Sequence, residues 1–148
     1  MERKEFIEIL LEIAFASMVC DGDIASEEQA FLKDIEKSDF YLKEFDLSKR
    51  LDELILLWEL HGLSVCEKIL NKTYKLTLTE DQKIVVLDFA IGIVRSDGTM
   101  QQAEIEFINS LMLNIKIPMD IVNMRYGNWS VITSIDLGGQ QENSESQY

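Results

Sequence analysis

The chain has 148 residues, of which 47% are hydrophobic and 28% charged, so its composition is that of one globular domain and not of a disordered segment. Acidic side chains outnumber basic ones 27 to 14, and the formal net charge is -13. This charge repels phosphate groups, so nucleic acids and anionic membrane surfaces are poor partners, whereas cations and basic partners are favoured. Only one proline and seven glycines interrupt the sequence, which favours long helices over many short strands.

The chain has only two cysteines and one histidine, which limits the metal and catalytic sites that it can form. Cys20 and Cys66 each lie in an apolar run, which predicts packed free thiols and no disulfide framework. His61 is the single histidine, so any site that requires two histidines is excluded. The most apolar stretch, residues 85–94, is far shorter than the ~20 residues of a membrane-spanning helix. We expect a cytoplasmic protein without a targeting segment.

Apolar residues recur at helical spacing through most of the chain. The pattern predicts helices over residues 3–20, 26–37, 51–61, 63–72, 80–96, 101–115 and 118–126, and a short helix or turn over 39–47. The segments 3–20 and 80–96 are apolar nearly all round, which is typical of central, buried helices. Thr79 starts the second of them with a capping-box pattern.

The C-terminal region differs from the rest of the chain. Between residues 129 and 137 apolar side chains recur at every second position, which predicts an extended apolar segment over 128–137. Residues 138–148 are polar and cannot support a core, so we expect a disordered tail. We therefore predict a single helical domain over residues 1–127. The extended apolar segment packs on the helices of this domain, on a partner or on a second copy of the chain.

The chain also contains an internal repeat at an offset of 76 residues, which aligns residues 9–35 with 85–111. Six aligned pairs are identical: Leu11/Leu87, Ala14/Ala90, Asp21/Asp97, Gly22/Gly98, Glu28/Glu104 and Phe31/Phe107. A duplication predicts two helical hairpins about a pseudo-twofold axis, with helices 3–20 and 80–96 at the centre of an all-α fold of roughly seven to eight helices. The alternative is that similar helices solve the same packing problem.

Each copy of the repeat carries an Asp-Gly pair and, seven residues after the Asp, a Glu in the first turn of the next predicted helix. This doubled pattern of buried helix, Asp-Gly, apolar loop residue and Glu resembles the tellurite-resistance TerB-like family over roughly residues 5–116. Cys20 and Ser96 precede the two Asp residues where that family tends to have Ala. The resemblance implies a small, duplicated, all-helical domain whose acidic residues are suspected of binding metal ions.

Two interpretations of these acidic loops stay open. Asp21, Glu28, Asp97 and Glu104 together offer the oxygen ligands that Ca²⁺ or Mg²⁺ requires, if a twofold axis brings both loops together. Alternatively, each Asp accepts hydrogen bonds within its own loop, each Glu caps its helix, and no metal binds.

The sequence contains no glycine-rich phosphate loop, nucleophile elbow or zinc-ligand spacing. We therefore expect a non-enzymatic TerB-like module that binds or scaffolds a protein partner, or a second copy of itself, in a stress-related system resembling tellurite resistance. No cofactor is expected beyond a weak Ca²⁺ or Mg²⁺ ion at the acidic loops. A metal-dependent hydrolase, in which paired carboxylates hold an ion that activates water, is the alternative.

Overall fold

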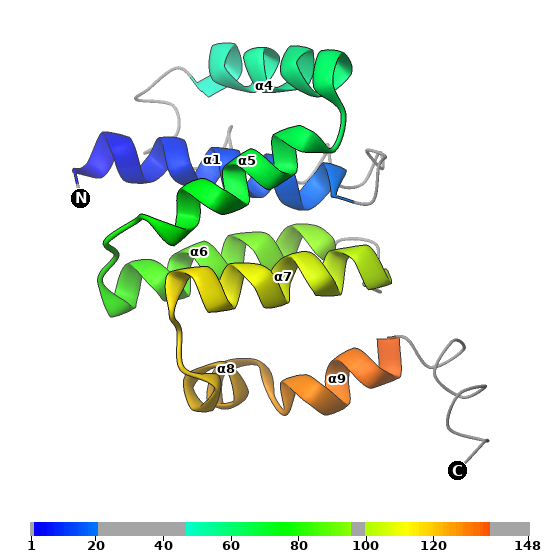
Figure 1. The fold of residues 1–148 in the computed structure, drawn as a ribbon. Helices are drawn as coiled ribbons and strands as arrows, with labels where there is room; N and C mark the ends of the chain where they lie inside the picture. The colour runs from blue at the N-terminus through cyan, green and yellow to red at the C-terminus, as the bar shows by residue number, and fades with distance from the viewer. Residues whose placement is uncertain (1, 21–46, 96–99, 137–148) are drawn as a thin grey trace.

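The computed structural model describes residues 2–20, 47–95 and 100–136, and in these ranges every element of regular secondary structure is an α-helix (Figure 1). The described helices are α1 (Arg3–Val19), α4 (Leu47–His61), α5 (Ser64–Tyr74), α6 (Glu80–Val94), α7 (Gln102–Ile115), α8 (Met119–Tyr126) and α9 (Trp129–Asp136). The predicted all-α fold class is confirmed. The predicted helix 26–37 and the segment 39–47 lie mostly outside the described residues.

The central helix of the fold is α1, which is buried on nearly all sides as its apolar sequence predicts, whereas α6 buries six of its 15 residues and is only partly enclosed. Every residue of α1 from Ile9 to Val19 is buried, and α1 packs directly against α6. The two helices run in the same direction (Figure 1). Small residues on both helices, such as Ala14 and Ala90, are fully buried. A helix buried on nearly all sides needs neighbours on each face, and the remaining helices provide them.

The outer helices form tiers on either side of this centre (Figure 1). Helices α4 and α5 cover α1, whereas α7 packs against α6 and contacts α5. His61 ends α4, where the predicted helix 51–61 also ends, and Gly62 follows with a φ of +64°, a conformation that glycine adopts readily at a helix end. Asn114 of α7 donates its side-chain N–H groups to the Leu70 carbonyl at 2.8 Å and to the Thr73 hydroxyl at 3.2 Å, which joins α7 to α5.

The predicted capping box at the start of α6 is confirmed. The Thr79 hydroxyl accepts the Gln82 backbone N–H at 3.1 Å, and the Gln82 side-chain carbonyl accepts the Thr79 N–H at 2.9 Å. The two bonds satisfy donors that every helix start leaves unpaired.

The predicted extended segment over 128–137 is wrong for residues 129–136, which form α9. Gly127 turns the chain between α8 and α9 with a φ of +90°. The side-chain oxygen of Asn128 accepts the Val131 backbone N–H at 3.4 Å. The backbone carbonyl of Asn128 accepts the Ile132 N–H at 2.9 Å, so the residue caps the start of the helix. This local cap outweighs the period-two pattern. The predicted tail 138–148 lies outside the described residues.

The predicted duplication can be compared only at the first helix of each copy, because residues 21–46 lie outside the described part of the chain. At the offset of 76 residues, α1 aligns with residues 79–95, which nearly coincide with α6. Among the described residues, no helix is both long enough and apolar enough to cross a membrane.

Candidate functional site

The predicted cation site is described at one of its four carboxylates. Asp21, Glu28 and Asp97 lie outside the described residues. Glu104 is buried in the first turn of α7, where its Oε1 accepts the Gln101 backbone N–H at 2.7 Å. This is the capping role that the second interpretation predicts. No cluster of three or more His, Cys, Asp or Glu side chains that could hold a metal occurs in the described ranges, and Ca²⁺ or Mg²⁺ at the acidic loops stays a prediction.

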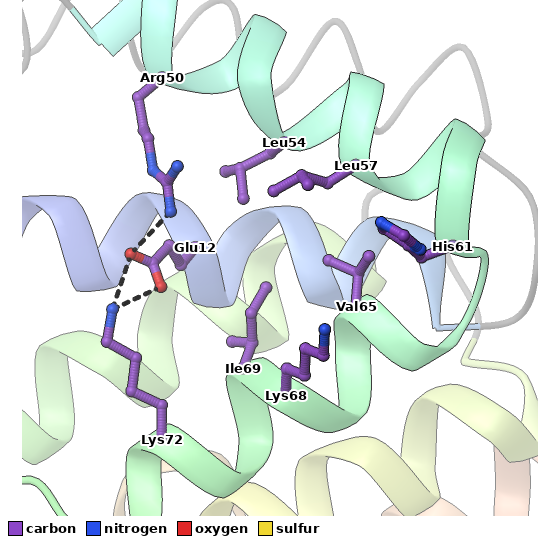
Figure 2. A pocket seen from close by; sticks show the side chains of 9 residues that line it. All are labelled: Glu12, Arg50, Leu54, Leu57, His61, Val65, Lys68, Ile69 and Lys72. Atoms are coloured by element: carbon purple, nitrogen blue, oxygen red, sulfur yellow. Dashed lines mark hydrogen bonds and ion pairs between the residues drawn. The ribbon is translucent and has the colours of Figure 1, made fainter.

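A pocket of about 170 Å³ lies where α1, α4 and α5 meet (Figure 2). Its apolar wall is made by side chains from the facing sides of α4 and α5, namely Leu54, Leu57, Val65 and Ile69. The helix α4 presents these leucines because they fall one turn apart on the side that faces α5. Charged and polar side chains stand at both ends of this wall.

Glu12 occupies one end of the pocket and is only 5% exposed. Its two oxygens accept the Lys72 ammonium at 3.0 and 3.1 Å, and the Arg50 guanidinium lies 3.4 Å from Oε2 (Figure 2). A buried carboxylate is costly unless cations pair with it. Because Arg50 belongs to α4 and Lys72 to α5, this one side chain of α1 holds both outer helices.

His61 and Lys68 stand at the other end of the pocket, and their side chains point toward the space between α4 and α5 (Figure 2). Neither side chain has a hydrogen-bond or ion-pair partner among the described residues. The Lys68 ammonium therefore offers donors at the edge of an apolar wall.

The charge of this pocket is opposite to that of the whole chain. Three of the 14 Lys and Arg residues and the single histidine line it, against one described carboxylate, in a protein of net charge -13. The described lining contains no hydroxyl or thiol group that could serve as a nucleophile. The arrangement is suited to holding an anionic group beside an apolar one.

Asp88 occupies the position of α6 that the repeat aligns with Glu12, and it too joins a central helix to an outer one. Arg125 of α8 donates to both Asp88 oxygens, at 2.9 Å from Nε and 2.5 Å from Nη2, and the Tyr126 hydroxyl donates to Oδ1. Burial raises the pKa of Asp88, but the hydrogen bonds from Arg125 and Tyr126 and the charge of Arg125 outweigh it and lower the pKa below its ordinary value.

The sequence interpretation missed this pocket, although it contained one usable signal. Glu12 is the only charged residue between positions 9 and 19 of the apolar helix 3–20, and a buried charge requires cations from elsewhere in the chain. His61 is the last residue of the predicted helix 51–61, and it ends α4. Cys66 is buried as predicted, with its thiol 3.7 Å from the Ala16 carbonyl oxygen.

We compared the chain with protein-family models, with curated proteins and with solved structures, and none of the three comparisons finds a match.

Proposed function

We propose that the protein is a non-enzymatic binding module whose pocket between α4 and α5 takes up an acidic, partly apolar segment of a partner protein. The observation that carries the proposal is the concentration of Arg50, Lys68 and Lys72 around an apolar wall in a chain of net charge -13. Opposite charges steer encounter and select the partner, while apolar contact supplies affinity.

The size of the pocket indicates what enters it. A volume of about 170 Å³ is close to that of cavities that hold a single benzene ring, so it fits one leucine or phenylalanine side chain and not a drug-sized molecule. Carboxylates on either side of that anchor would reach Lys68 at one end and the cations around Glu12 at the other.

The resemblance to TerB-like proteins supports the scaffolding part of the proposal and a stress-related setting similar to tellurite resistance. In agreement with a duplicated fold, α1 and α6 have nearly equivalent bounds and each carries a carboxylate, Glu12 or Asp88, that pairs with outer helices. Two helices of this kind would form a rigid centre that leaves the outer helices available for partners.

Selection from a displayed library of random peptides tests this proposal. The full chain should enrich peptides with a leucine or phenylalanine flanked by acidic residues. A Lys68→Glu variant should lose that enrichment, and Lys49→Glu is the matched control, because Lys49 is an exposed residue of α4 outside the pocket lining. Enrichment of basic peptides, or enrichment of acidic peptides that Lys68→Glu leaves unchanged, would contradict the proposal.

A further inference from the structure

A hollow of about 510 Å³ lies between the C-terminal half of α7 and α9, and its volume is about three times that of the pocket between α4 and α5. We call it the α7–α9 hollow. Three of its lining residues, Met112, Ile117 and Trp129, are buried, so an incoming molecule meets the exposed residues of the rim. Leu113 and Met119 belong to this rim and are 78% and 48% exposed. The fold therefore leaves two large apolar side chains in water beside a recess.

The rest of the rim of the α7–α9 hollow is almost without charge. It consists of Asn109, Lys116, Ser130 and Thr133, of which only Lys116 is charged. The Lys116 ammonium lies 5.8 Å from the centre of the Tyr74 ring, and Tyr74 belongs to α5 and not to the lining. The hollow thus offers apolar and uncharged polar contacts to a partner, and no anchor for a charged group.

The same region stands out in the distribution of charge along the sequence. Residues 107–135 contain one acidic residue, Asp120, and two basic ones, Lys116 and Arg125. The other 119 residues of the chain contain the remaining 26 acidic side chains. Arg125 is already paired with Asp88, so the hollow lies in a nearly neutral part of a strongly acidic chain. Depletion of charge beside exposed apolar side chains is typical of the core of a protein–protein interface.

Electrostatics indicates which partner this region fits. Two copies of a chain with net charge -13 repel each other, and the repulsion is smallest where the two facing surfaces are neutral. A basic partner gains nothing from this region, because the acidic side chains that would attract it lie elsewhere. The exposed leucines of α4 are a different case, because Asp52, Glu53 and Glu59 lie on the same helix as Leu56 and Leu60. Pairing two α4 helices would bring like charges together.

We propose that the α7–α9 hollow is the interface of a twofold-symmetric dimer of this chain. A twofold interface requires that one surface carry both a projecting group and the recess that receives it. Leu113 projects from the rim, and the hollow beside it has room for more than one apolar side chain. In the dimer, Leu113 of each copy enters the hollow of the other, and the flexible Met119 side chain packs around it. The dimer does not depend on the peptide pocket, because the two hollows share no lining residue among those described.

Sedimentation of the full chain at increasing protein concentration tests this proposal. The mass of the sedimenting species should rise from 17.1 kDa to twice that value. Raising NaCl from about 0.1 M to about 1 M should lower the dissociation constant by about threefold or more, because salt screens the repulsion between two acidic copies. A dimer held together by opposite charges would weaken under the same change, so the direction of the salt effect separates the two kinds of interface.

Two charge substitutions locate the interface. Leu113→Glu should raise the dissociation constant at least about tenfold, because it places a carboxylate in an apolar recess. Leu60→Glu is the matched control: Leu60 is 67% exposed, and like Leu113 it lies in the last turn of its helix, so the change in net charge and the effect on the helix dipole are the same. The control should leave dimerisation unchanged. Both variants should melt at nearly the same temperature, which shows that Leu113→Glu remains folded.

Several results would overturn the proposal. A chain that stays at 17.1 kDa at every protein and salt concentration does not form this dimer. Equal losses in Leu113→Glu and Leu60→Glu would show that net charge, and not the hollow, controls association. Intermolecular NOEs in a mixture of ¹³C-labelled and unlabelled chains provide the direct map: contacts from the Leu113 methyl groups to Met119 or Thr133 of the partner subunit are expected, and contacts confined to α4 would contradict the proposed interface.

Discussion

Glu12 on α1 and Asp88 on α6 occupy aligned positions in the two central helices, yet their surroundings differ. The Glu12 side chain is 7% exposed and is held by cations from two different helices. The Asp88 side chain is 37% exposed and receives both of its partners, Arg125 and Tyr126, from α8 alone. The comparison shows that carboxylates at aligned positions can hold outer helices to a central helix in two ways. Glu12 does so through a buried ion-pair cluster and Asp88 through a half-exposed one, and we expect the two clusters to contribute differently to stability.

The largest effect should follow from leaving Glu12 without its cations. The double substitution Arg50→Met with Lys72→Met should lower the free energy of unfolding by about 3–5 kcal/mol, because it leaves a buried carboxylate unpaired. Adding Glu12→Leu to the same chain should restore most of the loss, since the apolar cluster no longer contains a charge. Urea denaturation measures both steps, and a triple variant no more stable than the double one would show that the damage is not electrostatic.

Breaking the Asp88 cluster should cost less, because water reaches it. Asp88→Asn should lower the free energy of unfolding by about 1 kcal/mol, and a double-mutant cycle with Arg125→Met should assign most of that loss to the pair. The cycle is measured by the same denaturation experiment. A loss as large as that of the Glu12 cluster would erase the distinction between the two clusters.

The pH dependence of stability provides a separate test of Asp88. Its pKa in the folded chain is lowered below the ordinary value of 3.8, so the ionised form favours folding. The stability that it contributes is fully present above that ordinary value and is lost as the pH falls through the lower, folded-state pKa. The difference in unfolding free energy between the wild-type chain and Asp88→Asn should therefore be constant near neutral pH and shrink below about pH 4. A difference that grows on acidification would contradict the assigned pairing.

The smallest expected effect is that of added salt on the coupling energies of the two ion-pair clusters, and it should differ between them. Raising NaCl from about 0.1 M to about 1 M shortens the screening length to about 3 Å, which weakens exposed ion pairs more than buried ones. The coupling between Asp88 and Arg125 should fall by at least half, whereas that between Glu12 and Lys72 should change little. Double-mutant cycles at both salt concentrations measure the two couplings, and equal losses would contradict the difference in burial.

The sequence predicted the features that depend on local rules. Thr79 and Gln82 predict the start of α6 because their hydrogen bonds form within one turn. The predicted helix 51–61 likewise ends at the same residue as α4. The segment from Trp129 onward has a period-two apolar pattern, which predicts an extended segment, but it forms a helix because the Asn128 side chain caps its first turn.

The pocket could not be predicted in the same way. Lys68 and Lys72 look like ordinary solvent-facing lysines of an amphipathic helix, and only the packing of α5 against α1 brings Lys72 to Glu12. The partners of Asp88 are likewise distant in sequence, since Arg125 lies on α8. Side chains that meet across several helices depend on the tertiary arrangement, which no local pattern contains.

The central claim is that the pocket between α4 and α5 binds an anion beside an apolar group, and amide chemical shifts test it most directly. The ¹⁵N-labelled chain is titrated with an acetylated and amidated Glu-Leu-Glu peptide, and with Gln-Leu-Gln as the uncharged control. The account predicts shifts centred on Leu57, Lys68 and Ile69 that saturate with the acidic peptide and are much weaker with the control. Equal responses to both peptides, or shifts confined to other parts of the chain, would contradict it.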